Sequence, residues 1–208
     1  MRTYRTTLKS SESPWARLVS DLLSPPVVWL LLGTAIAIKF ADTRSQALLW
    51  IAIYAVLIFV LPVSYIAWNV HRGKITDIHM KERRQRFGPF AFSIACSAIG
   101  WLVLRLMNTP EMVSAFALFS LLQLAVLAII TLVWQISIHA MSITGAVVAI
   151  GAIFGVPQAL VVIPLVPLVG AARIKLHRHT PAQVVAGTIL GGILPAVLFA
   201  ILMLSTPF

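Results

Sequence analysis

Long stretches of apolar residues, separated by short polar segments, occupy most of the chain. Residues 48–68 and 115–134 are apolar on every side and lack the alternation of polar and apolar positions that is typical of membrane β-strands. A hydrocarbon layer of about 30 Å requires roughly 20 mostly apolar residues per helix. The pattern therefore predicts an all-α fold whose helices cross a membrane.

Seven membrane helices are predicted from these stretches. Their ranges are about 26–41, 46–69, 89–107, 111–134, 140–155, 157–172 and 183–205. Four of them begin near a proline, where a missing backbone N–H costs little. The fifth and sixth are short for complete spans, which is tolerated where helices pack against their neighbours. The prediction is one integral membrane domain over residues 1–208, a polytopic helical bundle with a cytoplasmic N-terminal segment (1–25) and a basic cytoplasmic loop (70–88).

The composition excludes a soluble globular domain. Hydrophobic residues make up 60% of the chain and charged residues 11%. The formal net charge is +10, but the basic residues lie in short loops and not on an extended water-exposed face, which argues against nucleic-acid binding. We expect them to contact lipid headgroups or a phosphorylated ligand. Cys96 is the only cysteine, so no intrachain disulfide can form.

The distribution of basic residues predicts the orientation in the membrane. With seven spans, 13 of the 16 Lys and Arg residues fall on one side: Arg2, Arg5, Lys9, Arg17, Arg72, Lys74, Lys81, Arg83, Arg84, Arg86, Arg173, Lys175 and Arg178. The other side holds Lys39, Arg44 and Arg105. Cytoplasmic loops carry the excess of positive charge. The N-terminus and the loops after the second and sixth spans are therefore predicted to be cytoplasmic.

Two segments on the predicted cytoplasmic side carry polar residues suited to chemistry. The first, residues 134–140, contains Ser137 and His139, and the second, residues 172–183, contains Arg173, His179 and Gln183. Ionisable groups at membrane depth are costly and suggest a functional role. For His139 alone, a histidine that ends a helix at the interface is an equally good explanation. The spacing of the five residues is more informative than any one of them.

Two motifs can be read from these residues. One is Arg173, five residues, His179, three residues and Gln183, and the other, which precedes it, is Ser137-Ile138-His139. Together they resemble the two downstream motifs of the type 2 phosphatidic acid phosphatase superfamily, the lipid phosphate phosphatases. The usual forms of these motifs are Ser-Arg, five residues, His, three residues, Asp, and Pro-Ser-Gly-His. The flanking residues are similar to those of a bacterial membrane branch of the superfamily. The resemblance implies a phosphatase in the bacterial cytoplasmic membrane that hydrolyses lipid phosphates or isoprenoid (poly)prenyl diphosphates.

The resemblance also implies a role for each motif residue. His179 would be the nucleophile and form a phosphohistidine, which divides one difficult displacement into two easier steps. His139 would protonate the leaving alkoxide and then help activate water. Arg173 would bind the phosphoryl oxygens through its planar guanidinium, and Ser137 would donate a further hydrogen bond. No metal or other cofactor is implied.

This sequence departs from the family pattern at three places. Gln183 stands where the family has an Asp that orients the nucleophilic histidine, and an amide stabilises imidazolium less well than a carboxylate. The second motif lacks its Pro and Gly. The first motif, Lys, six residues, Arg-Pro, has Gly88-Pro89 at the position counted from Lys81. We prefer Arg83 and Arg86 as the phosphate-binding equivalents and include Lys81 of the same loop among the phosphate-binding residues, although a positive-inside anchor explains this loop equally well.

Other functions weigh less. A scaffold that has lost turnover and serves as a structural or lipid-binding subunit of a larger membrane complex is the main alternative, favoured by the three departures. A hard metal would need carboxylates, and beyond the N-terminal segment this side offers only Asp77 and Glu82. A transition-metal site among His71, His79, His177 and His179 stays open as a minor alternative. A transporter would be expected to show repeated broken helices. The expected partners are membrane lipids and an amphiphilic phosphate substrate, and a homo-oligomer or a membrane-complex partner stays open.

Overall fold

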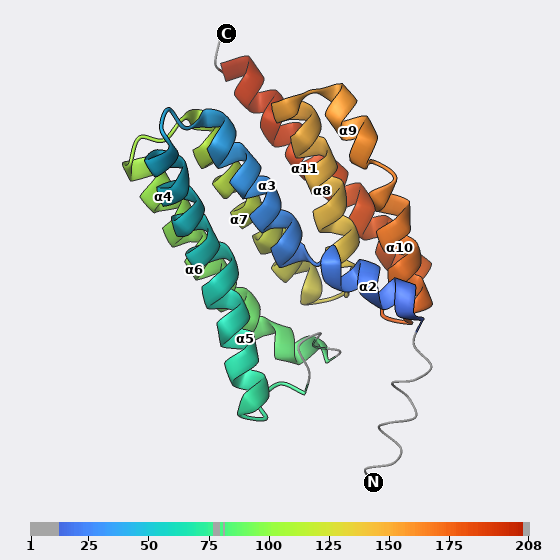
Figure 1. The fold of residues 1–208 in the computed structure, drawn as a ribbon. Coiled ribbons are helices and arrows are strands. Elements are labelled where there is room, and N and C mark those ends of the chain that lie inside the picture. Colours follow the sequence, from blue (N-terminus) through green and yellow to red (C-terminus); the bar gives the residue numbers. More distant parts are fainter. Residues whose placement is uncertain (1–12, 77–79, 81, 206–208) are drawn as a thin grey trace.

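The computed structural model describes residues 13–76, 80 and 82–205, and every regular element among them is helical (Figure 1). The α-helices are α2 (Pro14–Leu22), α3 (Pro25–Phe40), α4 (Arg44–Tyr54), α5 (Leu61–His71), α6 (Phe87–Leu106), α7 (Glu111–Thr131), α8 (Ile138–Phe154), α9 (Val156–Val162), α10 (Leu165–Lys175) and α11 (Pro181–Ser205). A π-helix, η1 (Ala55–Val60), joins α4 to α5, and a 3-10 helix, η2 (Arg83–Arg86), precedes α6. The predicted all-α fold is confirmed.

The seven predicted ranges coincide with helical segments to within three residues at either end. Five continuous segments of the described chain are long and apolar enough to cross a membrane: 44–71, 83–106, 111–131, 156–175 and 181–202. The pair α2 and α3, bent by 43°, raises the number to six if it forms one broken span. Helix α8 has 17 residues and is shorter than these five segments. The fold is thus a bundle with five to six candidate membrane helices, and the predicted count of seven is not confirmed.

Helix α2 lies within the N-terminal segment, for which the apolar pattern predicts no membrane helix. It begins after Ser13 with Pro14 at its first position, where proline is well tolerated. Its nine residues are too few to cross a membrane, so it leaves no long apolar stretch in the sequence. Helix α2 packs against α10, at the end of the bundle where η2 and the α10–α11 loop also lie (Figure 1).

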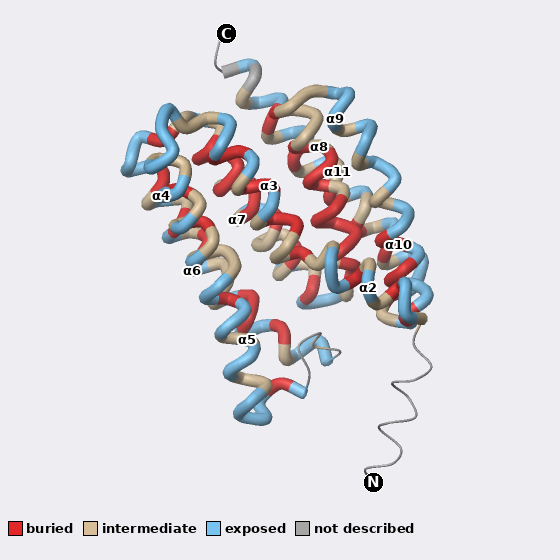
Figure 2. Tube along the Cα trace, in the orientation of Figure 1, coloured by how far each residue is buried: buried red, intermediate tan, exposed pale blue. Residues whose placement is uncertain are grey.

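The shortest of the predicted spans, α8, is the most enclosed. It packs against α3, α9, α10 and α11, and buried positions follow most of its length (Figure 2). An aromatic cluster of Trp29, Phe116, Phe119 and Phe199 fills the space beside it, with ring centroids 5.4–6.4 Å apart. Such offset and edge-to-face contacts add to the stability that burial alone provides. A helix surrounded by protein need not match the thickness of the hydrocarbon layer.

The outer surface of the bundle is apolar. Helix α9 and the π-helix η1 have no buried residue, and large aliphatic side chains such as Leu160, Val161 and Val197 are more than half exposed (Figure 2). A continuous apolar surface of this kind would be unfavourable in water. It suits a bundle whose outer helices face lipid tails, in agreement with the predicted membrane location.

Two glycines of α11 bring this helix into direct backbone contact with α8. A Cβ atom at Gly187 would lie 2.5 Å from the carbonyl oxygen of Ser137, and one at Gly191 would collide with the carbonyl of Met141. Small residues at such positions allow membrane helices to approach closely. The α8–α11 pair has the most extensive contact in the bundle, and both helices begin at the end where the motif residues lie.

Candidate active site

His179 is positioned by the turn that ends α10. The N–H of Arg178 donates to the carbonyl of Arg173 at 3.1 Å, and the N–H of His177 donates to that of Ile174 at 2.9 Å. His177 has φ of 51°, in the left-handed region. This pair of hydrogen bonds around a left-handed residue is a Schellman motif, which here closes the helix and reverses the chain. The spacing between Arg173 and His179 therefore corresponds to the last turn of α10 and this single reversal.

A capping box begins α11 immediately after His179. Thr180 Oγ1 accepts a hydrogen bond from the N–H of Gln183 at 3.3 Å, and Gln183 Oε1 accepts one from the N–H of Thr180 at 2.9 Å. This reciprocal pair is the usual signature of Ser or Thr followed three residues later by Glu or Gln. The sequence Thr180-Pro181-Ala182-Gln183 shows that signature, whereas the phosphatase motif predicts for Gln183 only a contact with His179.

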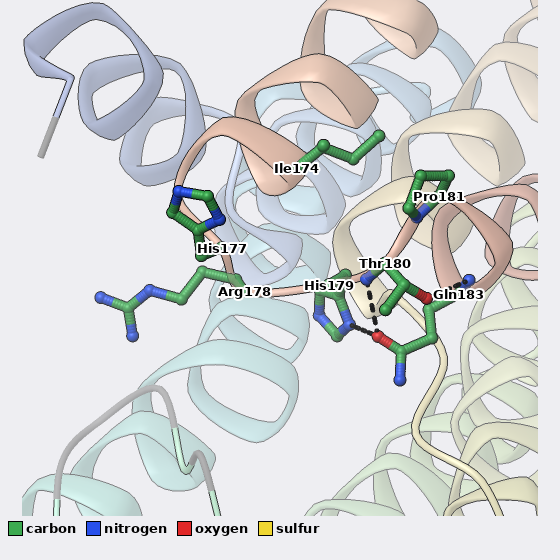
Figure 3. Close-up of a pocket in the computed structure, with 7 residues that line it drawn as sticks. All are labelled: Ile174, His177, Arg178, His179, Thr180, Pro181 and Gln183. Carbon is green, nitrogen blue, oxygen red and sulfur yellow. Dashed lines mark hydrogen bonds between the residues drawn. The ribbon is translucent and has the colours of Figure 1, made fainter.

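Gln183 also contacts the imidazole of His179, as predicted. Its Oε1 lies 3.3 Å from His179 Nδ1 (Figure 3). The backbone N–H of Thr180 can only donate, so the atom that faces it is the oxygen of the amide. The same oxygen faces Nδ1, which must then carry the ring proton. Nε2 of the neutral ring keeps its lone pair, as a nucleophile requires.

The electrostatic environment of His179 is dominated by cations. Burial, and after it the positive charges of Arg173, Arg86 and Arg178, lower the pKa of His179 from 6.5 to about 4, against the opposing effect of the hydrogen bond with Gln183. Only 8% of the His179 side chain is exposed. The ring is therefore neutral at pH 7, in an electropositive environment that favours an anionic ligand.

The titration of His179 gives the first test. We expect the ring to titrate near pH 4 and not near 6.5, since both burial and the neighbouring guanidiniums disfavour the imidazolium. The unfolded chain binds this proton already at about 6.5, so the contribution of His179 to folding stability is lost as the pH falls from about 6.5 to about 4. NMR of histidine-labelled protein in detergent, with His179→Ala to assign the signal, measures the pKa. Arg86→Gln should raise it, and a wild-type value at or above 6.5 would contradict the arrangement.

Arg173 is buried at the last turn of α10, with 4% of the side chain exposed. Its Nη1 donates to Ser20 Oγ of α2 at 2.6 Å. Its Nε atom is buried and makes no hydrogen bond with any residue in the described part of the chain. A buried donor without a partner is costly in a folded protein and suggests a ligand. A phosphoryl oxygen would satisfy it.

Of the three basic residues predicted from the loop before α6, Arg86 joins the site. It is buried, donates from Nε to the carbonyl of Met80 at 2.9 Å, and contacts the side-chain amide oxygen of Gln135 at 2.6 Å from Nη2. Arg83 is directed elsewhere: its Nη1 donates to the carbonyl of Val133, just after α7, at 2.8 Å. That bond satisfies an unpaired carbonyl at a helix end. Lys81 lies outside the described residues.

Ser137 and His139 lie at the beginning of α8. Ser137 is completely buried and caps the helix, with its Oγ accepting from the N–H of Ala140 at 3.3 Å. Its own N–H donates to the carbonyl of Gln183 at 3.0 Å. This bond ties the start of α8 to the start of α11, so His139, in the first turn of α8, is brought to the same end of the bundle as His179. His139 is buried, with 8% exposed.

An open depression of about 370 Å³ lies beside His179 (Figure 3). Its lining residues come from the end of α10 and the start of α11: Ile174, His177, Arg178, His179, Thr180, Pro181 and Gln183. In Figure 3 the Arg178 side chain extends away from Gln183, on the side of His177. The described residues contain no cluster of three or more His, Cys, Asp or Glu side chains suited to a metal ion. The depression is thus an opening toward a histidine flanked by cations.

No protein-family model matches this chain, and no curated protein or solved structure matches it. The resemblance to lipid phosphate phosphatases therefore depends on the sequence motifs alone.

Proposed function

We propose that this protein is a membrane phosphatase that removes phosphate from lipid phosphates or isoprenoid (poly)prenyl diphosphates through a phosphohistidine. One observation carries the proposal. A neutral, buried His179, oriented through Nδ1 by Gln183, is under the electrostatic influence of the guanidiniums of Arg173 and Arg86. Cations around an oriented imidazole suit an enzyme that must bind a phosphoryl group and attack it.

The reaction divides into two displacements. Nε2 of His179 attacks phosphorus, the bond from phosphorus to the ester or diphosphate oxygen breaks, and His139 donates a proton to the leaving oxygen. In the second step water attacks the phosphohistidine, His139 accepts the proton from that water, and inorganic phosphate leaves. Arg173 and Arg86 stabilise the negative charge on the equatorial oxygens in both transition states.

The location of the site supports an amphiphilic substrate. His179 follows α10 and precedes α11, two helical segments that belong to candidate membrane spans. A headgroup can enter at this end of the bundle while its tail remains in the apolar layer. Phosphatidate, phosphatidylglycerol phosphate and isoprenoid diphosphates all fit this description. The positive-inside rule favours a site that faces the cytoplasm, and the motif resemblance favours a bacterial inner membrane.

Phosphate release from a panel of these three lipids tests the proposal. We expect purified protein in detergent or nanodiscs to release phosphate from at least one of them, with a chelator present, since the chemistry assigned here uses His179, His139 and arginines. A water-soluble aryl phosphate is the control for the need for a lipid tail and should be hydrolysed more slowly. No release from any lipid of the panel would contradict the phosphatase proposal.

A scaffold without turnover is the second candidate, and one observation favours it. Ser137, Gln183 and Arg83 each have a structural role, at the start of α8, the start of α11 and the end of α7. These roles explain their presence without catalysis. In that case the site would bind an anionic lipid headgroup, as a structural or lipid-binding subunit of a membrane complex. Binding without phosphate release would distinguish this function from the first.

A further inference from the structure

Helix α2 is attached to the site residue Arg173. Ala16 of α2 packs in a buried cluster with Ala172 and Leu176 of α10, and Ser20, one turn further along α2, accepts the hydrogen bond from Arg173. All five side chains are buried. The hydroxyl of Ser20 is the hydrogen-bond partner of this guanidinium within the described chain, so α2 fixes its position.

The opposite face of α2 is apolar and exposed. Trp15, Leu18 and Leu22 are 45%, 59% and 60% exposed. Their spacing, i, i+3 and i+7, places them on one side of the helix. Arg17 and Asp21 lie between this face and the buried one. A short helix with one face on the protein, one exposed apolar face and flanking charges is typical of helices that lie in a membrane interface.

The contacts of α2 place it at the boundary between headgroups and tails. It packs against the last turn of α10, which ends a candidate membrane span at Lys175. It is followed after two residues by α3, an apolar helix that begins at Pro25 and turns away by 43°. Helix α2 is therefore at the level where one candidate membrane span ends and the apolar helix α3 begins. Tryptophan is enriched at this level, and a cation such as Arg17 suits anionic headgroups there.

We propose that α2 is an interfacial helix that inserts Trp15, Leu18 and Leu22 into the headgroup region of the bilayer and, through Ser20, holds Arg173 in place for the phosphoryl group. The second half of this statement rests on the proposed function. Ser20 is thus a positioning residue and not a catalytic one. The lipid surface that supplies an amphiphilic substrate would also stabilise the arginine that binds its phosphate.

Spin labels on α2 test the insertion. In a Cys96→Ser background, single cysteines at positions 18, 22 and 21 are labelled and the protein is reconstituted in vesicles of phosphatidylcholine and phosphatidylglycerol. The accessibility of each spin label is measured with two relaxation reagents: oxygen, which concentrates in the lipid, and a nickel chelate, which stays in the water. We expect the ratio of oxygen to nickel accessibility to be at least about threefold higher at 18 and 22 than at 21. Equal ratios would overturn the insertion, and so would shielding of position 18 from both reagents, which would indicate a protein partner.

Binding of inorganic phosphate tests the role of Ser20. We expect Ser20→Ala to weaken binding about tenfold, the scale of one charge-assisted hydrogen bond. It should also raise the pKa of His179, because the released guanidinium would move toward Asp21 and solvent, away from the ring. The matched control is Ser13→Ala, since Ser13 precedes α2 and makes no capping hydrogen bond with its side chain. A Ser20→Ala protein with unchanged affinity and unchanged His179 pKa would overturn the positioning role.

The two proposals fail in different ways. If wild-type protein binds phosphate but hydrolyses no lipid of the panel, the phosphatase proposal fails and the interfacial helix and Ser20 remain supported. If lipids are hydrolysed while the labels at 18 and 22 behave like the label at 21, α2 is not inserted and the phosphatase proposal remains. If wild-type protein binds no phosphate, the positioning role of Ser20 is overturned whatever the labels report.

Discussion

Replacing His179 with alanine should abolish phosphate release from every lipid that the wild-type protein hydrolyses. The expected loss is at least about 10³-fold, because no other nucleophile is assigned and removal of a nucleophile eliminates the covalent route entirely. The same change should eliminate the acid-labile phosphoprotein that rapid quenching with labelled substrate is expected to capture. Malachite green assays measure the release, and gel analysis of quenched samples measures the intermediate.

Substitutions of Gln183 test the same phosphohistidine chemistry, with smaller expected losses of turnover. Gln183→Ala removes the acceptor from His179 Nδ1 and half of the capping box, and turnover should fall by about 10 to 100-fold, the scale for losing an orienting group. Gln183→Glu keeps an acceptor and keeps the capping box, since glutamate also satisfies that motif. It should therefore retain more activity than the alanine variant. Its negative charge should raise the pKa of His179 and move the acid limb of the pH profile upward.

Arg83→Ala is the matched control for Arg86→Ala, a substitution in the site. Arg83 donates to the end of α7, so its loss should leave turnover within about twofold while it removes the same charge from the same loop as Arg86→Ala would. Arg86→Ala, in contrast, should impair phosphate binding strongly. A His179→Ala protein that retains a tenth of the wild-type rate, or equal effects of the two arginine substitutions, would show that the chemistry has been assigned to the wrong residues.

The positions of the helices follow from the sequence because each helix is coded by a local property. An apolar stretch of about 20 residues can satisfy its backbone within the membrane only as a helix, whatever surrounds it. For this reason even the two predicted ranges that are short for complete spans, 140–155 and 157–172, are found as helical segments, α8 and the α9–α10 segment. Whether a helix as short as α8 acts as a span depends on tertiary packing, and the count of seven is accordingly the part of the fold that is not confirmed.

The motif spacing predicted the part of the site that is local in the sequence. Arg173, His179 and Gln183 are connected by the end of α10 and the start of α11, so their proximity needs only one turn of chain. Whether Arg83 or Arg86 belongs to the site depends instead on how η2 packs against the end of α7 and against Gln135. The spacing of residues within the loop carries no information about that packing. Ser20 could not be predicted for the same reason: its partner Arg173 is 153 positions away.

The capping box of Thr180 and Gln183, in contrast, is encoded locally and could have been predicted. The pattern Thr-x-x-Gln before an apolar stretch is a recognised helix start. The phosphatase motif, in which this position orients a histidine, indicates only one of the two roles. The structure gives Gln183 Oε1 two neighbours at once, the N–H of Thr180 and Nδ1 of His179. Helix initiation and orientation of the imidazole are therefore coupled.

Gly191 is where a single methyl group should have the largest structural effect. A Cβ atom there would collide with the carbonyl of Met141, which belongs to the backbone of α8 and cannot move aside like a flexible side chain. Gly191→Ala should therefore force α8 and α11 apart and destabilise the protein by about 1–3 kcal/mol. The buried Cys96 offers a direct measurement: a thiol-reactive fluorophore reports its exposure during heating, and the melting temperature should fall by several degrees.

Gly192, the adjacent residue, allows the effect of helix packing to be distinguished from the effect of helix propensity. At Gly192 the nearest atom to an added methyl group is Cγ2 of Thr144 at 3.8 Å, an ordinary contact, so Gly192→Ala should be neutral or stabilising by up to about 1 kcal/mol. Both substitutions make the same chemical change in the same helix turn. Since the N–H of Ser137 bonds to the carbonyl of Gln183 across the same interface, Gly191→Ala should also weaken phosphate binding, whereas Gly192→Ala should not. If the two variants melt together, close α8–α11 contact does not hold the two histidine segments together, and the arrangement of the site needs another cause.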